Sequence, residues 1–171
     1  MPIPYARLSS GFGGRRHPVL GRMRMHKGVD YAAGSGTPIQ AAGDARVEFV
    51  GRKGGYGNTV ILNHGAGKTT LYAHMSRFAR LRPGQHVAQG TTIGYVGSTG
   101  MSTGPHLHYE FRVNGAHVNP LKMTLPPPAP LSGPALAAFK NETRRALDKI
   151  REVEDVIYMP DEDTRVATAK D

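Results

Sequence analysis

The chain has 171 residues, a formal net charge of +9 and no cysteine, which excludes disulfides, thiolate zinc sites and a thiol nucleophile. No run approaches the roughly 20 apolar residues that a membrane-spanning helix needs, and the first residues, MPIPYARLSS, lack the apolar stretch of a signal peptide. Residues 1–125 hold 15 basic and 4 acidic residues, against 7 and 9 in residues 126–171. The basic part favours an anionic partner: nucleic acid, anionic lipid or a carboxylate-rich cell-wall polymer.

Short β-like runs separated by glycine-rich turns occupy residues 9–113. They are rich in Val, Ile, Thr, Tyr and Phe, as strands are: ARVEFVG, NTVILNH, TTLYAHM, TTIGYVG and LHYEFRV. The segment NHGAGK, between two of them, predicts a hairpin loop. Helical periodicity of useful length is missing from this region. The sequence therefore predicts a mainly β domain over residues 1–123.

A proline-rich run, LPPPAPLSGP, interrupts this pattern and predicts an extended linker over residues 124–131. An amphipathic helix is predicted over residues 132–159, with Ser132 as its N-cap, and a polar tail over residues 160–171. Seven positions of the helix follow one another at alternating intervals of three and four: Leu136, Phe139, Thr143, Ala146, Ile150, Val153 and Ile157. The helix either packs on its own domain or associates with another copy or a regulatory partner.

Two histidines, His106 and His108, lie two residues apart in GPHLHYE. Side chains of a strand alternate between its faces, so these two are expected on one face, about 6.6 Å apart, with Leu107 pointing into the core. Two imidazoles that close can converge on one small site. The alternative is a pair of exposed polar residues on the solvent-facing side of a sheet.

The segment HKGVD places His26 four residues before Asp30. On a straight strand they would lie about 13 Å apart, too far to share an ion whose ligand bonds are about 2 Å long. Gly28 offers a bend between them, because glycine adopts backbone angles that other residues avoid. The alternative, a turn capped by Asp30, does not account for His26.

Histidine and aspartate ligands without cysteine are typical of an open zinc site, in which three protein ligands leave the fourth position to water. Such a metal polarises a carbonyl and lowers the pKa of its water. A further histidine nearby, not bound to the metal, could then take the proton or stabilise the developing charge. The pair in GPHLHYE can therefore hold two different roles.

Four stretches together resemble the lysostaphin/LytM-type zinc peptidases, peptidase family M23: SSGFGGRRHPVLGRMRMHKGVDYAA, GYGNTVILNHG, LYAHM and GSTGMSTGPHLHYEFRVNG. The resemblance runs over residues 9–123, and its three motifs, H-x-x-x-D, YAH and H-x-H, occur in the family's order. It implies a small, mostly antiparallel β-fold with a groove. It also implies cleavage of peptides in bacterial peptidoglycan.

The family's roles carry over residue by residue onto these motifs. By this resemblance His26, Asp30 and His108 bind one Zn²⁺ per chain. The family's two active-site histidines that do not bind the metal correspond to His74 and His106. All five positions match the family pattern.

The GFG…HPV lead-in is most similar to the Gram-negative murein endopeptidases of the family. These are exported to the periplasm and cut the D-Ala–meso-diaminopimelate crosslink. The resemblance therefore implies a periplasmic or cell-envelope enzyme acting on peptidoglycan stem peptides, present here as a truncated or processed form. It implies nothing about the C-terminal helix.

Several other features imitate functional sites. Residues 65–70, GAGKTT, resemble the end of a phosphate-binding loop, but a leucine replaces its first glycine and a strand-like run follows. RPGQHVAQGTTIGYVGSTG is similar to biotin- and lipoyl-carrying barrels but lacks their attachment lysine in the matching context. The remaining histidines, His17, His64, His86 and His117, are predicted to be structural or exposed, with His17 and His64 candidates to flank the groove.

Three classes of function remain for comparison. The first is a zinc endopeptidase. The second is a non-catalytic relative that binds peptidoglycan or activates another hydrolase, but such relatives typically lose metal ligands and this chain retains them. The third, a nucleic-acid binder, is disfavoured because aromatic residues make up only 7% of the chain and there is no tryptophan.

Overall fold

The computed structural model describes residues 1–16, 23–123, 125 and 130–158. The chain divides into two compact units, Met1–Pro128 and Ala129–Asp171. The described residues of the first unit form twelve strands and two short 3₁₀ turns: β1 (Arg7–Ser10), β2 (Gly13–Arg16), β3 (Met23–His26), β4 (Val29–Ala32), β5 (Pro38–Gln40), β6 (Ala45–Arg52), η1 (Gly54–Tyr56), β7 (Asn58–Asn63), β8 (Lys68–Phe78), β9 (His86–Val87), β10 (Thr92–Val96), β11 (His106–Val113), β12 (Ala116–Val118) and η2 (Pro120–Lys122).

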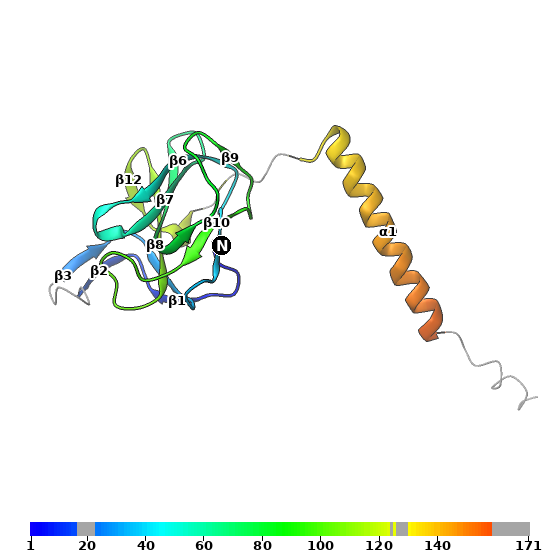
Figure 1. Cartoon of the computed structure of the whole chain (residues 1–171), viewed down its shortest axis with the longest axis horizontal. Coiled ribbons are helices and arrows are strands. Elements are labelled where there is room, and N and C mark those ends of the chain that lie inside the picture. Colours follow the sequence, from blue (N-terminus) through cyan, green and yellow to red (C-terminus); the bar gives the residue numbers. More distant parts are fainter. Residues whose placement is uncertain (17–22, 124, 126–129, 159–171) are drawn as a thin grey trace, which may run out of the picture. The chain divides into compact units, whose positions relative to one another are not determined.

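A single ten-stranded sheet forms most of this unit, and every strand pair in it is antiparallel (Figure 1). Its main order is β1-β4-β11-β8-β7-β6-β9, while β12 pairs with β11, and β10 pairs with both β8 and β5. Strands β2 and β3 form a separate two-stranded hairpin. The predicted fold class, a small antiparallel β domain followed by a helix, is confirmed.

The five predicted strand runs correspond to β6, β7, β8, β10 and β11. The NHGAGK segment forms the turn between β7 and β8, with Gly65 and Gly67 at positive φ. Because β8 follows this turn directly, the segment does not form a phosphate-binding loop, which would lead into a helix. The missed strands, β1 to β5, β9 and β12, have four residues or fewer, too few to show a clear alternation.

Strand β11 separates the core from the functional face of the sheet. Leu107 and Tyr109 are buried in the main apolar core, which is built from β-branched and aromatic residues of the neighbouring strands. The alternate residues, His106, His108 and Glu110, lie on the other face and line a groove. The expected placement of Leu107 in the core is confirmed, and the two histidines do share a face.

In the second unit, residues 130–158 are described, and they contain one helix, α1 (Gly133–Tyr158), close to the predicted span. Ser132 precedes it, and its carbonyl oxygen accepts a hydrogen bond from the backbone N–H of Leu136, 3.4 Å away. Most of the predicted linker and all of the predicted tail lie outside the described residues, so these boundaries stay predictions. In the part of the chain that the structure describes, no helix has the length and apolar character needed to cross a membrane.

Candidate active site

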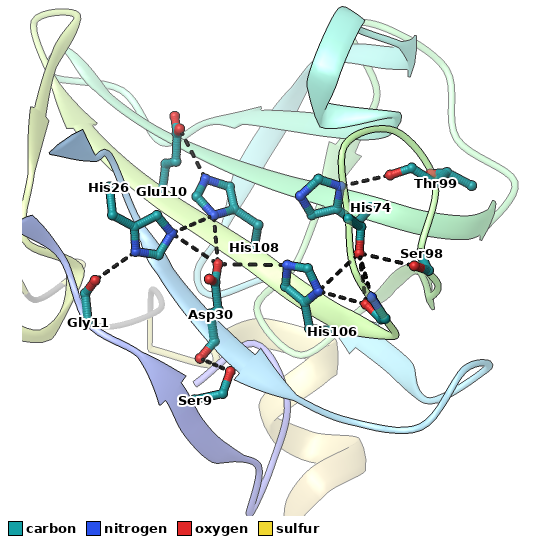
Figure 2. Close-up of polar contacts among 12 residues, drawn as sticks. Ser9, Gly11, His26, Asp30, His74, Ser98, Thr99, His106, His108 and Glu110 are labelled. Carbon is teal, nitrogen blue, oxygen red and sulfur yellow. Dashed lines mark hydrogen bonds and ion pairs between the residues drawn. The ribbon is translucent and has the colours of Figure 1, made fainter. Parts of the chain in front are cut away.

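Three side chains converge on one point at the floor of the groove (Figure 2). His26 Nε2 lies 3.0 Å from Asp30 Oδ1 and 3.1 Å from His108 Nδ1, and His108 Nδ1 lies 2.8 Å from Asp30 Oδ1. Ligand atoms bound tetrahedrally to zinc at about 2.0–2.1 Å lie about 3.3 Å from one another. The nearly equilateral triangle of two imidazole nitrogens and one carboxylate oxygen therefore fits zinc.

The sheet brings these three residues together from distant parts of the sequence. Asp30 on β4 lies directly opposite His108 on β11 in the antiparallel register. His26 ends β3 and reaches the same point because the chain turns at Lys27 and Gly28 before β4 begins. Straight-strand geometry had placed His26 and Asp30 too far apart, and the predicted bend at Gly28 removes that obstacle.

The role of Gly28 differs from the expected one. Its φ lies outside the left-handed region, so backbone freedom is not the reason for glycine here. Instead, a Cβ at this position would lie 2.4 Å from the carbonyl oxygen of Tyr109 and 3.0 Å from Cε1 of His108. Glycine is required because β11 passes too close to the turn for any side chain.

Each histidine of the triangle is oriented through its outer nitrogen. His26 donates its Nδ1–H to the carbonyl oxygen of Gly11, 2.6 Å away, which leaves the Nε2 lone pair facing the site. His108 is turned the other way: Nδ1 faces the site, and Nε2 lies 3.2 Å from Oε1 of Glu110. The two rings therefore present different nitrogens to the same point.

The electrostatics of the triangle suit a cation. Burial alone would raise the pKa of Asp30, but the imidazoles of His108 and His26 beside its Oδ1 hold it well below its ordinary value. Burial alone would lower the pKa of His108, yet hydrogen bonds to Asp30 and Glu110 raise it. Asp30 is therefore ionised, and a metal ion that binds His108 Nδ1 takes the place of a proton there.

His106 lies beside the triangle without belonging to it. Its Nε2 is 3.9 Å from Asp30 Oδ1, while its Nδ1–H donates to the carbonyl oxygen of Gly104, 2.8 Å away. The hydroxyl of Ser102 also donates to that carbonyl oxygen and lies 3.3 Å from the same ring nitrogen. In the neutral ring these contacts place the proton on Nδ1 and the lone pair on Nε2, which faces the groove.

His74 reaches the groove through an irregularity in β8. Between the pairs Asn58–Met75 and Val60–Tyr72, β7 advances by two residues and β8 by three, so β8 carries one extra residue, a bulge. His74 lies at this point with φ of 61°, a conformation that is rare for residues other than glycine. The bulge turns the imidazole of His74 towards the groove instead of into the core.

The His74 ring is also fixed by its outer nitrogen. Nδ1–H donates to the carbonyl oxygen of Thr99, 2.7 Å away, and the ring centre lies 4.8 Å from that of His106. Burial lowers the pKa of His74 to about 4, which the hydrogen bond to Thr99 only partly opposes. Near neutral pH His74 is therefore an uncharged ring with an unprotonated Nε2.

The loop that contains the repeated STG, residues 98–105, shapes this part of the groove. Thr99 is held by two hydrogen bonds through its hydroxyl, one to the carbonyl oxygen of Met75 and one from the backbone N–H of Asn58. Gly57 packs so tightly on this loop that a Cβ there would lie 2.4 Å from the Thr99 carbonyl oxygen. The acceptor of the His74 hydrogen bond is therefore rigidly placed.

The groove has a volume of about 640 Å³ and contains all five predicted site residues. Tyr56, Lys27, Met25 and Met101 also line it, and the two methionines are about half exposed. An extended, partly polar substrate can therefore approach the metal triangle from solvent. Lys27 provides a positive charge at the rim.

The remaining described histidines lie outside the metal triangle and differ in their surroundings. His64 is half-buried and hydrogen-bonds the Asp44 carbonyl oxygen and the Thr70 hydroxyl, so it is structural and does not line the groove. His86 is exposed, and His117 contacts a buried carboxylate. His17 lies outside the described residues. Sequence analysis did not identify four groups that act on the site: Gly11, Tyr56, Thr99 and Glu110.

Comparison with known proteins agrees with this site. The model of Peptidase family M23 matches residues 24–120, more than half of the chain and all five predicted site residues. The chain belongs to peptidase family M23. The resemblance stated from its motifs is thereby confirmed.

Curated relatives extend the match beyond the family domain. The DD-carboxypeptidase/endopeptidase Mpg of Neisseria meningitidis is 51% identical over 145 residues, covering 85% of this chain and 33% of the relative. The peptidoglycan DD-endopeptidase ShyC of Vibrio cholerae is 42% identical over 158 residues, covering 92% of this chain and 36% of the relative. The chain thus spans about a third of the length of these curated relatives.

Solved structures show the same fold. A zinc-containing peptidase from Vibrio cholerae superposes with a TM-score of 0.67 at 36% identity, covering 73% of this chain and 39% of that one. Helicobacter pylori Csd3 superposes with a TM-score of 0.62 at 42% identity, covering 90% of this chain and 42% of that one. The likeness to the zinc-containing peptidase supports zinc as the metal of this M23 domain.

Proposed function

We propose that this chain is the catalytic part of a zinc-dependent endopeptidase that hydrolyses peptide crosslinks of bacterial peptidoglycan. The observation that carries this proposal is the triangle of His26 Nε2, Asp30 Oδ1 and His108 Nδ1 at the floor of an open groove, with two further imidazoles beside it. The names of the Neisseria and Vibrio relatives support the substrate class. The bond is expected to be D-Ala–meso-diaminopimelate, and the place of action the periplasm.

The site residues divide into ligands and proton carriers. His26, Asp30 and His108 hold the metal, and the chemistry that a bound zinc supplies is polarisation of the scissile carbonyl and activation of a water near neutral pH. His74 and His106 each use Nδ1 for a backbone carbonyl oxygen and turn Nε2 toward the groove. One of these nitrogens accepts the water's proton and returns it to the leaving amine, while the other takes a proton from solvent and donates a hydrogen bond to the developing oxyanion.

The charge of the domain suits this substrate. Residues 1–125 carry 15 basic against 4 acidic residues, and Lys27 lies at the rim of the groove. Stem peptides with free carboxylates are attracted by such a surface. The same charge would attract nucleic acid. Among the described residues that line the groove, however, Tyr56 is the one aromatic residue other than histidine, so they form no aromatic stacking surface of the kind that single-stranded nucleic acids use.

The test is digestion of purified, cross-linked peptidoglycan with and without a chelator, with products identified by mass. We expect crosslinked dimers to convert to monomers, activity to disappear with the chelator, and zinc to restore it. Release of a single terminal alanine from uncrosslinked pentapeptides would reveal carboxypeptidase activity instead, the other activity in the name of the Neisseria relative. A fully active metal-free protein, or peptidoglycan left unchanged by the zinc-loaded protein, would refute the proposal.

A non-catalytic peptidoglycan-binding or hydrolase-activating module is the alternative. It predicts that the chain binds peptidoglycan equally well with and without zinc and releases no products. The complete donor set and the two oriented histidines favour the enzyme, because a binding module needs neither.

For the C-terminal helix we propose association with a second copy of the chain. Large apolar side chains of α1 are exposed in the described structure, among them Phe139 (54%), Ile150 (53%) and Val153 (56%). They belong to the strict three–four spacing of a coiled-coil seam. In a parallel pair, Lys149 and Glu154 of opposite helices flank this seam with opposite charges.

Sedimentation of the full chain tests this proposal. We expect a concentration-dependent dimer that Ile150→Glu converts to a monomer, whereas Arg151→Glu, a charge change outside the seam, leaves the dimer intact. A chain that stays monomeric at the highest accessible concentration would refute self-association. It would leave packing on the chain's own domain, or binding to a regulatory partner, as the explanation of the apolar face.

A further inference from the structure

Glu110 is a buried carboxylate that the proposed reaction does not use. Its side chain has no exposed surface, although it lies on the groove-facing side of β11, two residues after His108. Burying a carboxylate is costly unless hydrogen bonds and opposite charges compensate for lost hydration. The buried carboxylate of Glu110 therefore needs partners that compensate for its lost hydration.

Both oxygens of this carboxylate are fully engaged. Oε1 accepts a 2.7 Å hydrogen bond from the Tyr56 hydroxyl and faces Nε2 of His108 at 3.2 Å. Oε2 accepts hydrogen bonds from the Arg112 guanidinium and from Nε2 of His117, the latter at 3.1 Å. Arg112 supplies a compensating charge, and together with the contacts to Tyr56, His108 and His117 it keeps Glu110 an ionised acceptor next to a metal ligand.

An ionised carboxylate accepts hydrogen bonds and donates none, and one faces each ring nitrogen of His108: Asp30 faces Nδ1 and Glu110 faces Nε2. A ring that binds a metal ion through Nδ1 gives up the proton there, so its remaining proton is on Nε2, where Glu110 accepts it. We propose that Glu110 is a positioning residue that holds His108 in the tautomer and orientation that bind zinc through Nδ1. This inference rests on the proposed function, because it assigns His108 as a zinc ligand.

The physical consequence is a stronger and better oriented ligand. A carboxylate behind a ligating histidine fixes the ring and raises the basicity of its inner nitrogen, and loss of such a partner typically weakens metal binding by about 10–100-fold. Tyr56 donates to the same carboxylate from the wall of the groove. The structural alternative is that Glu110 merely pairs with Arg112 and stabilises the end of the sheet.

Substitutions distinguish these roles. Glu110→Ala removes the acceptor, and the isosteric Glu110→Gln retains a neutral acceptor oxygen. The matched control is Arg112→Ala, which breaks the buried ion pair but leaves the carboxylate behind His108. The dissociation constant for zinc is measured for each metal-free full chain by competition with a chromophoric chelator, and folding is checked by thermal melting.

We expect Glu110→Ala to bind zinc about 10–100-fold more weakly than the parent, and Glu110→Gln to recover part of that loss. Arg112→Ala should melt at a lower temperature but bind zinc within about threefold of the parent. In the ¹⁵N spectrum of the zinc-loaded parent, His108 should carry its proton on Nε2, and Glu110→Ala should accelerate exchange of that proton with solvent. If Glu110→Ala does not fold, Glu110→Gln carries the test, with zinc binding a few-fold weaker than the parent expected.

Parent-like zinc affinity in a folded Glu110→Ala, or in Glu110→Gln where that variant carries the test, would overturn the proposal. So would an equal loss of zinc in Arg112→Ala, because the effect would then travel through packing. Because zinc binding is measured without substrate, a failure of the proposal for Glu110 can be distinguished from a failure of the proposed peptidase function. A parent that binds zinc with this dependence on Glu110 but leaves peptidoglycan intact would refute only the proposed function.

Discussion

Replacing Gly28 with alanine is the sharpest test of how the fold builds the metal site. The added methyl group would lie 2.4 Å from the Tyr109 carbonyl oxygen and 3.0 Å from Cε1 of His108. The first neighbour is backbone in the middle of β11 and cannot rotate away. To reach even a tight contact of about 3.0 Å, the turn and β11 must separate by about 0.6 Å, a strain of the kind that overpacking produces.

This displacement acts directly on the ligand triangle. The turn connects His26, at the end of β3, to Asp30 on β4, and His108 lies on β11. Zinc sites tolerate deviations of only about 0.2 Å in ligand distances, so we expect Gly28→Ala to weaken zinc binding at least tenfold. Overpacking typically costs about 2 kcal/mol, which lowers the melting temperature of a domain of this size by about 8 °C.

The assay is a pair of measurements on the metal-free protein, a thermal melt and a zinc titration against a competing chelator. Gly34→Ala is the matched control, because its nearest neighbour would be Thr37 Oγ1 at 3.9 Å and its φ is not positive. That variant should match the parent in both measurements. A Gly28→Ala protein with the melting temperature and zinc affinity of the parent would refute this reasoning. It would show that the turn can move away from β11 at no cost and that their close packing is not needed for the metal site.

Three further outcomes are expected. His108→Ala should lose most of its zinc, whereas His106→Ala and His74→Ala should retain it and turn over about 10²–10⁴-fold more slowly; equal zinc loss in all three would contradict the division into ligands and proton carriers. A chain cut after Met123 should retain zinc, because all five proposed site residues precede that point, and loss of zinc would show that the domain boundary is misplaced. Burial lowers the pKa of His64, so the unfolded chain binds the proton more tightly and stability should fall as the pH drops below about 6.5. The drop in melting temperature between pH 7.5 and pH 5 should therefore be smaller in His64→Asn than in the parent, and an equal drop would contradict this prediction.

The central part of the site was predictable because it follows strand periodicity. Alternation on a strand places His106 and His108 on one face, and the structure confirms both this and the burial of Leu107. The same alternation continues to Glu110, so the signal for that residue was present. It was missed because a lone carboxylate two residues beyond a motif is usually a solvent-exposed strand residue.

Other parts of the site depend on features that sequence periodicity does not encode. His74 faces the groove through a bulge and a positive φ, and regular alternation along β8 does not predict either. Its assignment came from family resemblance alone. The acceptors at Gly11 and Thr99 are backbone carbonyl oxygens, which every residue type has, so no choice of residue marks them.

The four imidazoles also differ in how their orientation is secured. His26, His74 and His106 each donate Nδ1–H to a backbone carbonyl oxygen, and so each presents Nε2 to the groove. Nδ1 lies close to the main chain, so a neighbouring loop carbonyl readily reaches it. His108 presents Nδ1 instead, which sends its outer nitrogen, Nε2, far from its own backbone into the protein interior. A side-chain acceptor must meet it there, and Glu110 does so. Of the four imidazoles, His108 is therefore the one whose orienting hydrogen bond can be removed by substituting a single side chain, that of Glu110.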